Sequence, residues 1–157
     1  MPLLYRALVL AAQSVLTFGV MWFVYLLFAW ADYEGGIDGL IGFTLFQPLL
    51  GAVFSGGTVA VCLLFGLPIR VSGPVRRWWL RHAAVQRVLL LAGIALLGLS
   101  GLYATTVTAA EGLPRQVPNL PLAAAGWSVT AFALLHSYPS PALQRWAARL
   151  TLGSDTA

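Results

Sequence analysis

Charge is what this sequence most lacks. Only 9% of its 157 residues are charged, and lysine does not occur at all, so all nine basic residues are arginine. A soluble domain of this size carries about 25% charged residues. Because hydrophobic residues make up 59% of the chain, burial in an ordinary protein core does not account for the deficit. The composition therefore excludes a soluble globular domain and indicates a membrane protein.

Cysteine is nearly absent as well. Cys62 is the single cysteine, so the chain forms no internal disulfide and lacks the cysteine pair of thiol–quinone redox proteins. No charged residue lies inside the long apolar runs, although transporters and proton relays usually keep one there. The sequence also contains no evident nucleophile–base pair and no metal-ligand spacing. We therefore expect no catalytic residue, no metal site and no cofactor.

Four long stretches carry no charged side chain: residues 7–31, 39–69, 88–110 and 116–144. An ionised group at the bilayer centre costs about 2.5–3.5 kcal/mol on insertion scales, so runs of this length predict membrane spans. We expect an all-α fold with four transmembrane helices in one bundle within residues 1–138. The spans are expected at about 5–31, 40–67, 88–110 and 120–136. Residues 139–157 form a tail with a short amphipathic helix.

The first run shares two features with a signal peptide. Arg6 precedes it, and Ala29, Trp30 and Ala31 have the small-x-small pattern of a cleavage site. However, the apolar core of a signal peptide is about 7–15 residues long, and this run is much longer. We expect the run to be retained as a true span. Cleavage after Ala31 is the alternative, and it would leave three spans.

The second run is too long for one upright helix. If wholly helical, residues 39–69 would extend about 46 Å, against a hydrocarbon core of about 30 Å. Proline removes a backbone donor and clashes with the preceding turn. Either the helix kinks at Pro48, or residues 39–46 lie at the surface and the span begins at Pro48. Because a kink frees a backbone carbonyl, Gln47 and Pro48 are the expected ligand site of a transporter.

Arginine is distributed unequally between the two sides of the membrane. With four spans, all arginines except Arg115 fall on one side, and Asp32, Glu34, Asp38 and Glu111 fall on the other. Arginine-rich loops stay in the cytoplasm. We therefore expect a multi-pass protein of the cell inner (plasma) membrane with its N-terminus and C-terminus both cytoplasmic.

Two cytoplasmic segments combine arginine with tryptophan and are expected to form short interfacial helices. Ser72 is a plausible N-cap of the first helix, which includes Pro74. Arginines beside tryptophan at headgroup level contact anionic lipid or an acidic partner, and no nucleic acid is needed to explain the basic charge. The expected lipid or partner contacts are Arg76, Arg77, Trp78, Trp79, Arg81, Arg145, Trp146 and Arg149.

The remaining motifs have ordinary explanations. We expect His82 and His136 to be interfacial histidines, with haem ligation as the alternative. The stripe of Phe18, Trp22 and Tyr25 is expected to form an outer aromatic belt, with a quinone or carotenoid groove as the alternative. Small residues four positions apart predict close helix packing. These pairs are Gly51–Ser55, Ala52–Gly56, Gly101–Thr105 and Gly126–Thr130.

The functional hypothesis combines these observations. Helix faces suited to close packing are present, and residues that carry out chemistry inside the bilayer are absent. We expect a non-enzymatic accessory or scaffold subunit that packs against a larger membrane protein complex, with anionic lipids and other membrane subunits as partners. The alternatives are a small-solute or lipid transporter that uses the break at Gln47 and Pro48, and a haem- or quinone-binding electron-transfer subunit.

Overall fold

The computed structural model describes residues 3–31, 33, 36–108 and 114–137. Most of this part is helical, in the order α1 (Leu3–Ala31), α2 (Ile37–Phe65), α3 (Leu67–Val71), α4 (Gly73–Arg81), α5 (Ala83–Leu102) and α6 (Leu120–His136). Three of these helices, α1, α2 and α5, are long and apolar enough to cross a membrane. Helix α6 is equally apolar in character but has only 17 residues. The structure therefore fits a multi-pass membrane protein.

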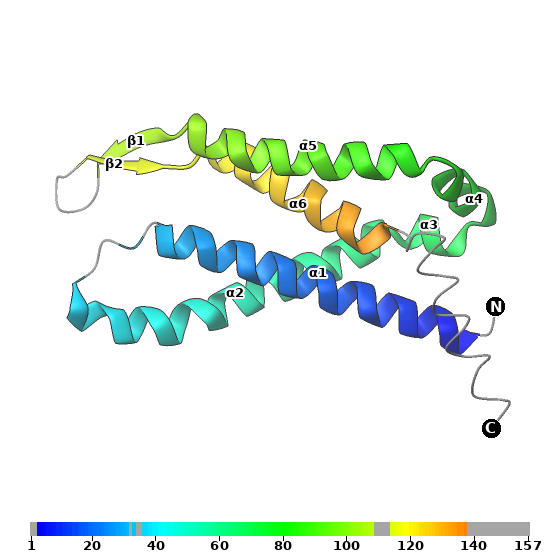
Figure 1. Cartoon of the computed structure of the whole chain (residues 1–157), viewed down its shortest axis with the longest axis horizontal. Coiled ribbons are helices and arrows are strands. Elements are labelled where there is room, and N and C mark those ends of the chain that lie inside the picture. Colours follow the sequence, from blue (N-terminus) through cyan, green and yellow to red (C-terminus); the bar gives the residue numbers. More distant parts are fainter. Residues whose placement is uncertain (1–2, 32, 34–35, 109–113, 138–157) are drawn as a thin grey trace, which may run out of the picture.

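Helix α6 and the three long helices form two helical hairpins (Figure 1). Helices α1 and α2 make one pair and α5 and α6 the other, and α6 also contacts α1 and α2. The core forms around α6, where Ala131 and Leu135 are buried together with Met21, Val59 and Cys62. Short α6 is thus the element that joins the two hairpins.

Glycine lets α5 and α6 approach closely. A Cβ atom on Gly126 would lie 2.6 Å from the backbone nitrogen of Leu97 and 2.8 Å from the carbonyl oxygen of Gly93. Both distances are too short for a real side chain, so only glycine permits this spacing. The close packing expected of Gly126 and Thr130 is confirmed here, since Thr130 lies against Gly93.

The connections between helices follow their turn residues. Gly66 ends α2, and Pro68 lies in the first turn of α3. Ser72 is the N-cap residue of α4, as expected, although its side chain makes no capping hydrogen bond. The side chain of Asn119 caps α6 by accepting a hydrogen bond from the Leu122 N–H at 3.2 Å. Its own N–H donates to the carbonyl of Ser100 at 2.8 Å, which fixes the start of α6 to the end of α5.

A β-hairpin departs from the expected all-α fold. Strands β1 (Thr105–Thr108) and β2 (Pro114–Val117) pair antiparallel between α5 and α6. Helix α5 accordingly covers 83–102 and not the expected 88–110. Threonine and valine are β-branched and favour strands, which explains why the helix does not continue through β1. The expected helical packing of Gly101 with Thr105 is therefore wrong, because Thr105 is in a strand and Gly101 is exposed.

Pro48 lies inside α2 and does not divide it. The helix is continuous from Ile37 to Phe65, so residues 39–46 belong to the same helix as the rest of the run. Of the two expectations for this stretch, the structure favours the kink, and the ribbon of α2 changes direction along its length in Figure 1. Because Pro48 has no backbone N–H, the carbonyl of Thr44, four residues earlier, has no helical hydrogen-bond donor.

One end of the molecule gathers the basic segments. The start of α1, the end of α2, the start of α5 and the end of α6 lie there beside α3 and α4 (Figure 1). We call this the basic end, after Arg70, Arg76, Arg77 and Arg81. The β-hairpin lies at the opposite end.

Candidate functional site

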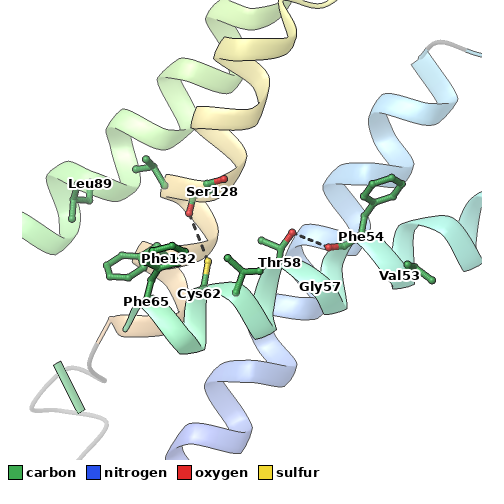
Figure 2. A pocket seen from close by; sticks show the side chains of 11 residues that line it. Val53, Phe54, Gly57, Thr58, Cys62, Phe65, Leu89, Ser128 and Phe132 are labelled. Carbon is green, nitrogen blue, oxygen red and sulfur yellow. Dashed lines mark hydrogen bonds between the residues drawn. The ribbon is translucent and has the colours of Figure 1, made fainter. Parts of the chain in front are cut away.

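A surface groove is lined by residues of α2, α5 and α6. Its volume is about 670 Å³. Figure 2 shows most of its lining. The residues are Val53, Phe54, Gly57, Thr58, Val61, Cys62 and Phe65 from α2, Leu89 from α5, and Ser128, Val129 and Phe132 from α6. Val53 and Phe65 are 72% and 75% exposed, so the groove opens sideways along the helices and is not an enclosed cavity.

Two polar side chains of the groove, Thr58 and Cys62, have partners within the chain. Thr58 donates its hydroxyl hydrogen to the carbonyl of Phe54 at 2.8 Å and accepts from the indole N–H of Trp127 at 2.8 Å. The thiol of Cys62 points to the carbonyl of Ser128 at 4.0 Å. With these groups occupied, the walls offer mainly hydrocarbon, so the groove suits an apolar occupant.

Helix α4 is fixed beside one end of the groove by Trp79. This side chain is only 6% exposed, and its indole N–H donates to the carbonyl of His136 at 2.8 Å. Its ring makes an edge contact with Phe132, at a centroid distance of 6.1 Å. Gln86 in turn donates to the carbonyl of Trp79 at 2.9 Å. Because Phe132 lines the groove, these contacts bring the basic end against it.

The C-terminal end of α6 is capped by side chains from other segments. The last carbonyls of a helix have no partner within it, and a cation near them is favourable. Arg70 donates from Nη2 to the carbonyl of Leu135 at 3.2 Å, beside the bond from Trp79 to His136. Ser137 donates to the carbonyl of Leu134 at 2.9 Å, and Gln13 donates to the carbonyl of Ser137. These bonds connect α1, α3 and α4 to the end of α6.

His136 is part of this buried junction. It is 2% exposed, its Nδ1 donates to the carbonyl of Phe132 at 2.9 Å, and the two rings stack at 4.3 Å. The expectation of an interfacial side chain is therefore wrong for His136. Its Nε2 faces Gly66 and has no partner among the described residues. A haem iron at this nitrogen would require the α2–α3 junction to move.

The interfacial position expected for His82 stays a prediction. His82 lies exposed between α4 and α5, stacks on Trp78 at 4.7 Å and hydrogen-bonds the Trp78 carbonyl through Nδ1 at 2.7 Å. The two histidines thus make separate local contacts, one at the surface and one in the junction. In the part of the chain that is described, no group of three His, Cys, Asp or Glu residues is placed to hold a metal ion.

The expected lipid-contact residues divide into three groups. Arg77, Trp78 and Arg81 are exposed on α4, and Arg76 is half-buried. Trp79 differs from the expectation, since it is buried and holds α4 against α6. The remaining three, Arg145, Trp146 and Arg149, lie outside the described residues.

Gln47 and Pro48 take part in the packing of α1 against α2. Tyr25 donates its hydroxyl hydrogen to Oε1 of Gln47 at 2.8 Å, and Trp22 donates its indole N–H to the carbonyl of Pro48 at 2.9 Å. Gly51 lies against the same two aromatic rings. The expectation that Trp22 and Tyr25 form an outer belt is therefore wrong, because both side chains face α2.

Sequence reasoning did not identify the groove or the buried junction at its end. The groove depends on how two hairpins are spaced, and the lining residues follow no motif. The only sequence signal was the small residue Gly57, which directly follows the two predicted packing pairs on the same helix. No protein-family model, curated protein or solved structure matches this chain.

Proposed function

We propose that this chain is a non-enzymatic accessory or scaffold subunit of a larger membrane complex. The observation that carries the proposal is the groove beside α2. It is an apolar hollow along α2, a helix long and apolar enough to cross a membrane, and no described part of the chain fills it. Packing against another membrane component would cover this hollow. A subunit of this kind contributes binding surface and needs no catalytic residues.

The proposed membrane arrangement has four spans, with α6 as the fourth. Its 17 residues extend about 26 Å, close to the lower limit for a span. The start of α1 and the end of α6 lie together at the basic end, as an even number of spans requires (Figure 1). By the positive-inside rule this end is cytoplasmic, in the inner or plasma membrane.

The alternatives from the sequence have less support. A transporter that uses Gln47 and Pro48 would need these groups for its substrate, yet both accept hydrogen bonds from α1. A haem-binding subunit would need an accessible histidine nitrogen within the helices, yet His136 is buried against Gly66. An accessory subunit requires neither free polar groups at Gln47 and Pro48 nor an accessible nitrogen on His136.

Native mass spectrometry of the gently solubilised protein tests the proposal. We expect the chain to co-purify with at least one other membrane protein. The variant Gly57→Leu adds a side chain to the groove at a position where a Cβ atom meets no neighbour within 4 Å. It should weaken retention of the partner, whereas Gly98→Leu, an equally open position on α5 outside the groove, should not. A chain that is always isolated without a protein partner would contradict the accessory role.

A further inference from the structure

We propose that the groove and α4 together form a site for one anionic phospholipid. One acyl chain lies in the groove, and the phosphate is bound at the basic end by Arg76, with Arg77 and Arg81 nearby. This inference rests on the proposed function, because the bound lipid would complete the surface against which the larger complex packs.

The groove has the shape and polarity that an acyl chain requires. Its α2 wall extends from Val53 to Phe65, which corresponds to about 18 Å along a helix. Its volume of about 670 Å³ is in the range of cavities that hold small ligands. The sideways opening admits a hydrocarbon chain directly from the bilayer. A polar metabolite would gain little there, since the polar atoms of Thr58 already have partners.

The basic end lies where the headgroup of such a lipid would emerge. Phe65 is the last residue of α2, and Phe132 is one turn before the end of α6. Trp79 contacts Phe132, so α4 lies next to this end of the groove. Arg76 is three residues before Trp79 on the same helix, so both side chains project from one face. This spacing places Arg76 on the face of α4 that carries Trp79, the residue that contacts the groove-lining Phe132.

The arginines of α4 are available for a phosphate. In the described part of the chain, Arg76, Arg77 and Arg81 form no hydrogen bond or ion pair through their side chains. No acidic residue occurs in the sequence between Asp38 and Glu111, so no neighbouring carboxylate in this segment neutralises them. Arginine binds phosphate through two parallel hydrogen bonds. Trp78, which is 50% exposed, suits the same interfacial depth.

Lipid binding to the purified full chain tests this proposal. The probes are phosphatidylglycerol and phosphatidylcholine, each added to the detergent-solubilised protein and counted as bound lipid by native mass spectrometry. We expect wild-type protein to prefer phosphatidylglycerol. The triple variant Arg76→Gln, Arg77→Gln, Arg81→Gln should lose that preference, by about fivefold in affinity for each arginine removed. Arg115→Gln, on β2 at the opposite end of the molecule, is the control and should keep it (Figure 1).

Filling the groove should have a different effect from removing charge. Gly57→Leu should reduce binding of both lipids, whereas Gly98→Leu should leave both unchanged. Ser128→Leu, on the α6 wall, provides a second groove variant if Gly57→Leu does not fold, as judged by circular dichroism. Unaltered lipid binding in a folded groove variant would overturn the proposal, as would an unaltered headgroup preference in the triple arginine variant.

Photo-crosslinking in native membranes separates this inference from the accessory role. A photoreactive residue at Val61, in the groove, should form a phospholipid adduct that is depleted by the triple arginine variant. A transmembrane helix of a partner protein crosslinked there instead would overturn the lipid site but support the accessory role. Lipid binding without any co-purifying protein would support the lipid site and contradict the accessory role.

Discussion

The close contact between Gly66 and His136 predicts how a substitution at Gly66 changes the stability of the protein. The backbone of Gly66 has φ −83° and ψ −3°, which alanine adopts without strain. On backbone grounds alone, Gly66→Ala would stabilise the protein by about 0.4–1 kcal/mol. However, the added methyl group would overlap the imidazole ring of His136. Glycine is therefore needed at position 66 because the His136 ring leaves no room for a side chain, and not because of the backbone conformation of the turn.

We expect Gly66→Ala to lower the free energy of unfolding by about 1–3 kcal/mol, the usual cost of overpacking. The His136 ring cannot move freely, because it stacks on Phe132. In addition, the backbone carbonyl of His136 accepts the hydrogen bond from the Trp79 indole. Displacing it would put that buried bond at risk, which adds about 1–3 kcal/mol if the carbonyl is left unsatisfied. The measurement is unfolding in mixed micelles followed by circular dichroism.

A double-mutant cycle attributes the effect to the contact. In a His136→Ala background the ring is gone, so Gly66→Ala should cost nothing or stabilise slightly. The expected coupling energy is about 1–3 kcal/mol. Gly98→Ala is the control, since a Cβ atom at this position on α5 meets no neighbour. Equal destabilisation by Gly66→Ala with and without His136 would refute the steric explanation.

Two further predictions concern the packing that surrounds the groove. Gly126→Ala should force α5 and α6 apart and destabilise the protein by about 1–3 kcal/mol in the same unfolding measurement. An effect no larger than that of Gly98→Ala would contradict the close approach to Gly93. Trp79→Phe keeps an aromatic ring but leaves the carbonyl of His136 without its donor, and it should destabilise by about 1–3 kcal/mol. Hydrogen exchange should then be faster in α4, whereas Trp78→Phe, at an exposed position, should leave it unchanged.

Local patterns in the sequence predicted the long helices well. The apolar runs and their charged borders identify α1, α2, α5 and α6 because the cost of burying charge in a bilayer acts on each residue separately. Ser72 and Pro74 indicated the start of α4 in the same way, since each acts on its own backbone. The fourth helix, Leu120–His136, lies where the sequence placed it.

The β-hairpin and the buried junction were not predictable in this way. The threonines of β1 follow a glycine-rich apolar run, and hydropathy alone does not distinguish a helix end from a short strand. Trp79 and His136 are 57 residues apart in the sequence, and their hydrogen bond exists only after both hairpins have packed. Interfacial roles for these two residues were reasonable from sequence position, but tertiary packing buries both of them.

Whether α6 crosses the membrane is the most direct test of the account. Cys62 is the only cysteine, so Cys62→Ser gives a cysteine-free background. Single cysteines are then placed at Gln116, before α6, and at Ala157, after it, and intact cells are treated with a membrane-impermeant maleimide. We expect Gln116→Cys to react from outside and Ala157→Cys to react only after permeabilisation. Labelling of both positions from the same side would show that α6 does not span the bilayer and would contradict the four-span arrangement.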